Sequence, residues 1–277
     1  MKAVRFVDSH GEARVGALED TRVRDAGPAG PRGFVPTPKA WAALGQASGP
    51  EYDLGDIRLL HPVVPEKILA IGVNYRSHAD ESELDVPEVP VVFAIWTSAL
   101  IGPDDDIVVP LEETRPDFEG EVAVVLGERV YRATDEEARR AIGGITAFHD
   151  VTGRRAQLET PLRQFTLGKS FDTFAPLGPS IASPDSLDVE RIGLRTTVGG
   201  EVMQEAWTSD FVFGLTDLIV YLSKGLTLEA GDVIATGTPG GVGDSRRPPR
   251  YLEEGDVVEV WVEGVGTLRN RVRRERS

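Results

Sequence analysis

Cysteine is absent from the 277-residue chain. Its absence excludes disulfides, thiolate metal sites, iron–sulfur clusters and a cysteine nucleophile. A metal ion bound by this chain would therefore have to be held by oxygen ligands, with histidine as the remaining common ligand.

Long apolar runs are also missing. No stretch approaches the roughly 18 consecutive apolar residues that predict a membrane-spanning helix. The first residues, MKAVRFVDSHGEARVG, lack the apolar segment of a secretory signal peptide. We therefore expect a cytoplasmic protein that does not associate with membranes.

Basic residues are in deficit. The chain has 45 Asp and Glu residues against 30 Lys and Arg residues, so its formal net charge is −15. Such a chain repels the phosphate backbone of nucleic acids, and we expect no nucleic-acid partner. The surplus carboxylates are the ligands that hard divalent cations prefer. Only five of the basic residues are lysines, so a lysine within a distinctive motif stands out.

The chain is long enough for one large domain or two smaller ones. Its first part differs from the rest. Lys2–Val7 and Ala13–Leu18 predict a small hairpin, and residues 26–38 are rich in Gly and Pro, which favours a loop. We predict a small N-terminal domain over residues 1–60 and a larger, metal-dependent catalytic domain over residues 61–277.

Short β-type runs separated by Gly and Pro dominate the larger part. A capping box at Thr134–Glu137 predicts a helix that continues to Ala141, and Thr216–Ser223 also has helical spacing. The pattern predicts an α+β, mostly β fold with long functional loops. The candidate strands are Ile68–Val73, Val91–Ile95, Ile107–Val109, Glu119–Leu126, Ile142–His149, Leu194–Val198, Val233–Thr236, Val257–Val262 and Gly266–Val272.

Three carboxylates suggest a metal site. In a strand, Glu119 and Glu121 project to the same side because side chains alternate faces. Two carboxylates this close repel each other unless a cation lies between them. Asp150 ends another apolar run and starts a loop with Arg154 and Gln157, so it is a candidate third ligand. Alternatively, the two glutamates form a solvated strand face and Asp150 is a turn or cap residue.

A histidine and a glutamate follow the run Ile68–Val73. His78 and Glu81 are three residues apart, so on a helical turn Glu81 could orient the imidazole of His78. Such a pair can deprotonate a water molecule, and its place in a loop suggests a lid. The alternative is a surface histidine with acidic neighbours.

Two Gly-rich segments could face an anionic ligand. Lys169 lies in one of them, where its ammonium group could meet a substrate anion or a carboxylate that binds metal. The turn 236–243 could offer backbone N–H groups to a carboxylate or an enolate oxygen. Neither segment has the spacing of a P-loop or a dinucleotide-binding motif. Alternatively, Lys169 is an ordinary surface lysine and segment 236–243 is a plain tight turn.

Taken together, these segments resemble the fumarylacetoacetate hydrolase family, from about Lys67 to Val272. The family's members are metal-dependent enzymes that act on oxo-acids and diketones. Seven segments in the same order carry the resemblance: KILAIGVNYRSHADE, SALIGPDDDIVVP, DFEGEVAVVLG, HDVTGRRAQ, LGKSFDTFAPLGP, LTLEAGDVIATGTPGGVG and LEEGDVVEVWVEGVGTLRNRV.

The resemblance implies a fumarylacetoacetate hydrolase-like mixed β-roll with a small N-terminal domain, and a homodimer. It also implies Mg²⁺ or Mn²⁺, with Ca²⁺ as a further option, bound by the three carboxylates. By the same resemblance the catalytic residues are His78, Glu81 and Lys169. The implied substrate-binding residues are Tyr75, Arg76, Gln157, Gly237 and Thr238, and the implied metal ligands are Glu119, Glu121 and Asp150.

Three departures from the family pattern concern the substrate. Family members often have a lysine at the position of Ile95. Ile95 and its neighbour Trp96 therefore predict fewer cations in the pocket and more apolar pocket surface. His149 replaces an asparagine beside Asp150, and Arg155 replaces an acid in the same loop. All three candidate ligands are retained.

The resemblance favours a hydrolase that cleaves a carbon–carbon bond in a diketone or oxo-acid of the fumarylacetoacetate or acylpyruvate type. In that mechanism His78 activates water while the metal stabilises the departing enolate. The same enolate chemistry permits an isomerase or a decarboxylase that acts on an acid of the 2-oxo or 2-hydroxymuconate type. A binding protein that kept the fold without the activity is a third possibility.

Overall fold

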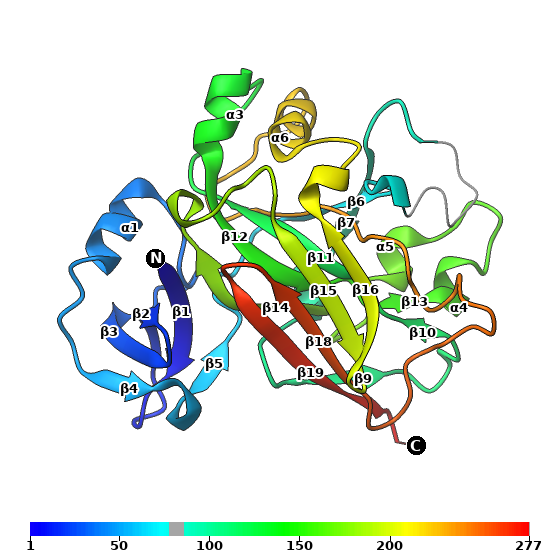
Figure 1. Cartoon of the computed structure of the whole chain (residues 1–277), viewed down its shortest axis with the longest axis horizontal. Coiled ribbons are helices and arrows are strands. Elements are labelled where there is room, and N and C mark those ends of the chain that lie inside the picture. The colour runs from blue at the N-terminus through cyan, green and yellow to red at the C-terminus, as the bar shows by residue number, and fades with distance from the viewer. Residues whose placement is uncertain (78–85, 277) are drawn as a thin grey trace.

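The computed structural model describes residues 1–77 and 86–276, and strands predominate in it (Figure 1). The α+β, mostly β prediction is confirmed. The predicted residues His78 and Glu81 lie outside the described residues. Among the described residues, no helix is long and apolar enough to cross a membrane.

A 12-stranded sheet forms the framework of the molecule. Its main path runs β4-β3-β2-β1-β14-β12-β11-β17-β6-β7, with β5 paired to β1 and β8 paired to β14. Its strands are β1 (Lys2–Val7), β2 (Ala13–Glu19), β3 (Arg22–Pro28), β4 (Glu51–Asp53), β5 (Arg58–Leu60), β6 (Ile68–Gly72), β7 (Val91–Ile95), β8 (Leu100–Ile101), β11 (Gly120–Leu126), β12 (Ile142–His149), β14 (Ala175–Ala182) and β17 (Val233–Ala235).

A five-stranded sheet packs against β11, β12 and β14, in front of them in Figure 1. Its order is β16-β15-β18-β19-β9, and a separate two-stranded ladder joins β10 to β13. These strands are β9 (Asp106–Val109), β10 (Pro116–Asp117), β13 (Thr152–Gly153), β15 (Gly193–Val198), β16 (Glu201–Trp207), β18 (Val257–Val262) and β19 (Gly266–Arg274).

Strand β11 is buried on both faces. Val122 and Val124 enter the core between the two sheets, whereas Ala123 and Val125 enter a second core on the opposite face. This alternation follows from the period of two along a strand, and burial of both faces explains the continuous apolar run. The strand that begins at the carboxylates is therefore held firmly on both sides.

Helices α3 and α6 lie at one end of the sheets, at the top of Figure 1, whereas α1 lies beside the N-terminal strands. Thr134 caps α3 through its hydroxyl, and Glu137 completes the predicted capping box. Helix α6 packs Leu218 and Leu222 into the core between the sheets. The helices are α1 (Pro38–Leu44), α3 (Asp135–Ala141), α4 (Arg154–Gln157), α5 (Phe165–Gly168) and α6 (Leu215–Ser223).

Residues 1–60 form strands β1 to β5 and helix α1. Strand β1 pairs with β14, so these strands continue the large sheet of the remainder of the chain. The indole N–H of Trp41 in α1 donates to the carbonyl of Gly143 at 2.8 Å, which adds a contact between the two parts.

The sequence prediction missed strand β14, which begins within the Gly- and Pro-rich segment that follows Lys169. Its prolines cannot donate to a ladder, and proline normally argues against an interior strand. Pro179 lies within a register shift opposite β12, between Ile145 and Ala147, and Pro176 pairs with Ile101 of β8. Strand β16 was also missed, because its polar residues alternate only weakly with apolar ones.

Gly120→Ala should destabilise the fold, because Gly120 lies between the two sheets where little space remains. An added Cβ would lie 2.0 Å from Thr196 Oγ1 and 3.2 Å from a methyl group of Val260. Overpacking of this kind costs about 1–3 kcal/mol, which urea unfolding would measure as a lower midpoint. Adding Thr196→Ala removes the closest contact and should recover part of the loss. A single variant as stable as the parent would contradict this packing.

Candidate active site

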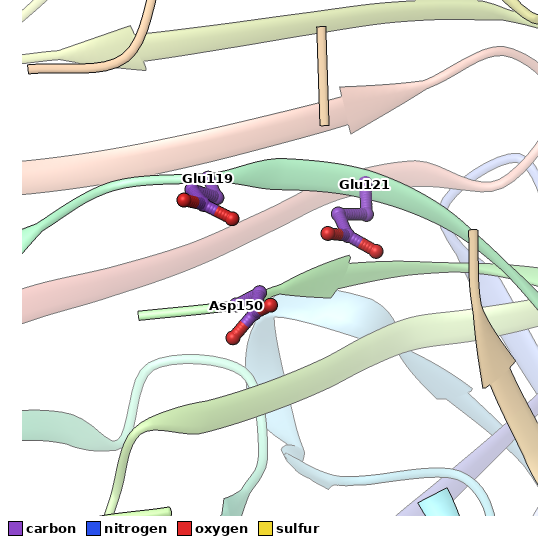
Figure 2. A group of neighbouring side chains, drawn as sticks. All are labelled: Glu119, Glu121 and Asp150. Atoms are coloured by element: carbon purple, nitrogen blue, oxygen red, sulfur yellow. The ribbon is translucent and has the colours of Figure 1, made fainter. Parts of the chain in front are cut away.

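Three buried carboxylates meet where β11 begins and β12 ends (Figure 2). Glu119 and Glu121 flank Gly120 and point to the same side, as the period of a strand requires. Asp150 follows β12, and its N–H donates to the Glu119 carbonyl at 2.9 Å. Ligand oxygens of the three residues all lie within 4.8 Å of one another. Antiparallel pairing of the two strands thus assembles this triad.

Lys169 neutralises part of this charge. Its ammonium group donates to Glu119 Oε2 at 2.8 Å, to Asp150 Oδ2 at 2.5 Å and to Thr152 Oγ1 at 2.9 Å. These three bonds use all the donors that an ammonium group has. Burial opposes its charge, but Asp150 and Glu119 outweigh that effect and raise the pKa of Lys169. The lysine is therefore protonated at neutral pH.

Arg154 is the second buried cation. Its guanidinium contacts Glu119 Oε1 at 2.6 Å and Asp117 Oδ2 at 2.8 Å. Its Nη1 donates to Gln157 Oε1 at 3.0 Å. Although burial disfavours the charge, Asp117 and Glu119 raise the pKa of Arg154 further above its usual value. We expected Arg154 and Gln157 in a loop; instead they lie in the short helix α4, which turns both toward the triad.

The remaining charge is negative. Asp117 and the three residues of the triad are buried carboxylates, whereas Lys169 and Arg154 are the two cations bonded to them. With all six groups ionised, two negative charges are uncompensated.

The surroundings also shift the pKa values of two triad carboxyls. Burial raises the pKa of Asp150 to about 7. Burial, and secondly the charge of Asp150, raise the pKa of Glu121 well above its usual value.

These residues fit a divalent cation. The donor set consists of carboxylate oxygens, which suit Mg²⁺, Mn²⁺ or Ca²⁺. Asp150 Oδ1 is buried and has no hydrogen-bond partner among the described residues, so it can accept a further cation. One divalent ion would also balance the two uncompensated charges. In such a site Glu119, Glu121 and Asp150 would hold the metal.

Asp117 holds the backbone near Glu119 in place through several hydrogen bonds. Its carboxylate accepts the N–H groups of Phe118 at 2.8 Å, Gly243 at 2.7 Å and Asp244 at 3.0 Å, and it pairs with Arg154. It therefore connects the triad to the Gly-rich turn after β17. The sequence motifs predicted no role for Asp117 or Arg154, although both residues lie within the segments that resemble the family.

The turn after β17 also bonds directly to the triad and to Gly120. Gly237, at φ 100°, donates its N–H to Glu121 Oε2 at 2.9 Å. Thr238 Oγ1 donates to the Gly120 carbonyl at 2.9 Å, and Gln204 donates to Thr238 at 2.7 Å. We expected these N–H groups to face a ligand anion; that of Gly237 instead binds a carboxylate of the triad.

A cavity of about 390 Å³ opens beside the triad. The ring of Phe93 lies 5.3 Å from Lys169 Nζ and stacks on Phe165, with 5.5 Å between the ring centroids. The lining residues are Ile71, Gly72, Val73, Phe93, Glu119, Arg154, Gln157, Leu158, Arg163, Phe165, Lys169, Thr238, Val242, Asp244, Ser245 and Arg247.

A larger hollow of about 540 Å³ lies elsewhere, against β2, β3 and the end of α1. Two arginines on its wall, Arg22 and Arg24, are already paired with Asp53 and Glu51. The described residues that line this larger hollow include no member of the triad and no unpaired buried charge. We therefore place the chemistry in the smaller cavity.

Three predicted substrate-binding residues, Tyr75, Arg76 and Gly237, are not among the described residues that line the cavity. Tyr75 is fully buried against Phe211, and its hydroxyl has no partner among the described residues. Arg76 is exposed and donates to the Phe211 carbonyl at 2.9 Å. By contrast, Gln157 and Thr238 both line the cavity.

The sequence departures act differently from what we expected. Ile95 is buried in the core and Trp96 is 53% exposed, and neither is among the described lining residues. The expected gain of apolar pocket surface is therefore wrong for this pair; Phe93 and Phe165 supply that surface. His149 is buried, which lowers its pKa to about 3 and keeps it neutral. Arg155 lies in α4 and is not among the described lining residues.

Glu121→Gln and Asp150→Asn should each abolish stabilisation by a divalent metal, because each removes an anionic ligand. The amide oxygen of the glutamine side chain could still accept the N–H of Gly237, so the local fold should survive. For the parent protein, Mn²⁺ at a hundred times its Kd should add about 2.7 kcal/mol to the free energy of unfolding. Thermal unfolding with and without Mn²⁺ measures this. The exposed Glu12→Gln is the matched control; equal stabilisation of all variants would refute the assignment.

Metal affinity should fall as the pH drops from 8 to 6. The pKa of Asp150 is raised to about 7, so its carboxyl is increasingly protonated below that pH, and a proton must leave before metal binds. One competing proton weakens binding by at most roughly tenfold per pH unit below the pKa. Calorimetry in buffers of different ionisation enthalpy would measure the released proton. Affinity that is constant across this range would contradict the shift.

Comparisons with known proteins agree with this geometry. The family model described as "Fumarylacetoacetate (FAA) hydrolase C-terminal" matches residues 67–273. Oxaloacetate tautomerase YisK of Bacillus subtilis is 42% identical over 228 residues, which cover 80% of this chain and 75% of that protein.

Two solved structures match almost the whole chain. The 5-carboxymethyl-2-hydroxymuconate delta-isomerase from Mycobacterium smegmatis is 33% identical, with a TM-score of 0.83 and full coverage of both chains. The fumarylacetoacetate hydrolase from Exiguobacterium antarcticum is also 33% identical, with a TM-score of 0.84 and coverage of 99% of this chain and 100% of that chain. The predicted fold is confirmed, and the chain belongs to the fumarylacetoacetate hydrolase family of enzymes.

Proposed function

We propose that this enzyme is a divalent-metal-dependent isomerase that interconverts the keto and enol forms of a 2-oxo acid such as oxaloacetate. The observation that carries the proposal is the buried triad of carboxylates, one of which, Glu119, lines the cavity together with Lys169. Similarity to an oxaloacetate tautomerase and to a hydroxymuconate isomerase favours isomerisation over the hydrolysis that the sequence suggested first.

The bond changes of this reaction are few. A base takes a proton from the carbon next to the 2-oxo group, the electron pair forms a carbon–carbon double bond, and the oxo oxygen gains a proton. A bound Mg²⁺ or Mn²⁺ would act as a Lewis acid that stabilises the negative oxygen. Glu119, Glu121 and Asp150 would hold that ion.

Lys169 is suited to stabilise the enolate oxygen or to protonate it. It lines the cavity and remains charged because two carboxylates contact its ammonium group. Its donors are all engaged, so a substrate oxygen would take the place of one present partner. The ring of Phe93 over the ammonium group limits where that group can move.

We propose His78 as the base for the carbon-bound proton, oriented by Glu81 as the family resemblance implies. Gln157 and Thr238 are proposed to contact the substrate, because both line the cavity. The apolar side chains Phe93 and Phe165 form part of the wall and reduce the access of water to the enolate.

Hydrolysis is the second candidate. The high similarity to the Exiguobacterium fumarylacetoacetate hydrolase favours it. The two reactions share the enolate and differ in the next step: hydrolysis needs water to attack a second carbonyl, whereas isomerisation needs only a proton. Decarboxylation of a 3-oxo acid would use the same stabilised enolate.

The test is the conversion of enol-oxaloacetate to the keto form, followed by ultraviolet absorbance with Mn²⁺ or Mg²⁺. We expect metal-dependent conversion that EDTA abolishes. Lys169→Met should lower kcat by about 10²–10³, the usual loss for a group that stabilises developing charge. His78→Ala should also lower kcat.

Lys224→Met is the matched control, because Lys224 lies at the end of α6, outside the cavity lining. The same preparations should be assayed with an acylpyruvate for carbon–carbon cleavage. Faster cleavage of the acylpyruvate than conversion of oxaloacetate would favour the hydrolase instead.

A further inference from the structure

Gln204 reaches the start of β11 from the five-stranded sheet. It lies on β16, where the register with β15 shifts by one residue. Met203 and Gln204 are both buried as a result, although neighbouring residues of a regular strand point to opposite faces. An amide side chain from β16 is thereby buried beside Gly120.

The amide of Gln204 makes three hydrogen bonds. Its Oε1 accepts the N–H of Gly120 at 3.0 Å. Its Nε2 donates to Thr238 Oγ1 at 2.7 Å and to the Pro239 carbonyl at 2.9 Å. Because a backbone N–H can only donate and a carbonyl can only accept, these partners fix which end of the amide carries the oxygen.

The same bonds fix the hydroxyl of Thr238. Its Oγ1 accepts from Gln204, so its own proton is left for another partner, and it donates to the Gly120 carbonyl at 2.9 Å. Gln204, Thr238 and Gly120 thus form a closed ring of three hydrogen bonds. The N–H of Gly120 is held from β16, and its carbonyl is held from the turn after β17.

That turn is itself fastened to β16. Arg246 donates from Nη2 to the Met203 carbonyl at 2.8 Å and from Nε to the Gly241 carbonyl at 3.1 Å. A Cβ added to Gly241 would lie 2.2 Å from the Met203 carbonyl oxygen, so the turn and the strand are in close contact. These contacts oppose a shift of the turn relative to the strand that carries Gln204.

Gly120 separates two of the candidate metal ligands. Its N–H belongs to the peptide that joins it to Glu119, and its carbonyl belongs to the peptide that joins it to Glu121. The ring therefore holds both peptides from which the two glutamates extend. Like charges on the glutamates favour rotation of these peptides that would move the carboxylates apart, and the ring opposes that rotation.

We propose that Gln204 is a positioning residue of the metal site: it holds the two Gly120 peptides and the Thr238 hydroxyl so that Glu119 and Glu121 stay aligned for one ion. This inference rests on the proposed function, because it requires a divalent ion at the triad. It does not depend on which reaction the enzyme catalyses.

Titration of the metal-free protein with Mn²⁺ in a calorimeter tests this role, because it measures the affinity and the number of sites separately. Gln204→Met has a similar length and lacks all three bonds. It should bind Mn²⁺ with the parent's stoichiometry and about 10- to 100-fold more weakly. Thr238→Val should also weaken binding, and Thr238→Ser, which keeps the hydroxyl, should recover most of that loss.

Combining Gln204→Met with Thr238→Val tests the ring itself. The double variant should weaken binding by less than the product of the two single effects, because each substitution alone already opens the ring. Single effects that multiply in full would overturn it. If Gln204→Met does not fold, the comparison of valine with serine at position 238 decides, and equal affinities of those two variants would overturn the proposal.

Gln46→Met is the matched control, because Gln46 is exposed and lies just beyond the end of α1. It should keep the parent's Kd for Mn²⁺. A merely structural role of Gln204 would lower the urea midpoint of Gln204→Met and leave its Kd for Mn²⁺ unchanged, and that result would overturn the proposal.

Failure of this role differs from failure of the proposed function. If Mn²⁺ binding depends on Gln204 but oxaloacetate is not isomerised, the function is wrong and the positioning role stands. If isomerisation proceeds with Mn²⁺ and Gln204→Met binds the ion like the parent, the function stands and the positioning role is wrong.

Discussion

Repulsion between buried carboxylates is the constraint on which the rest of the site depends. Glu119, Glu121 and Asp150 lie together where water cannot screen them, and each ionised group disfavours the next. Lys169 and Arg154 offset part of that repulsion. A divalent cation would offset the remainder, so metal binding and the stability of this region are coupled.

The surrounding fold supplies the rigidity that this constraint requires. Strand β11 is packed on both faces, and the turn after β17 supplies N–H groups to both Asp117 and Glu121. Carboxylates held in this way cannot relax apart when they ionise. The same rigidity keeps the ligand oxygens close enough for one ion to bind them together.

A shared enolate would explain why this chain is similar to proteins named as a tautomerase, an isomerase and a hydrolase. In the proposed reaction, the triad and Lys169 would act on the oxo group. Differences in reaction and substrate would then depend on the other residues of the cavity wall. In this chain they include Phe93, Phe165, Arg163 and Arg247.

The sequence alone determined the oxygen-only ligand chemistry, the same-side projection of Glu119 and Glu121, and most of the strands, because these follow from composition and local periodicity. Only the tertiary structure decided how Asp150, Arg154 and Asp117 join the pair, since contacts between distant strands and a short helix leave no local pattern. It likewise placed Ile95 in the core and Trp96 outside the cavity, and it showed β14 as a strand despite its prolines. Those outcomes depend on which surfaces pack together, and packing is a property of the whole chain.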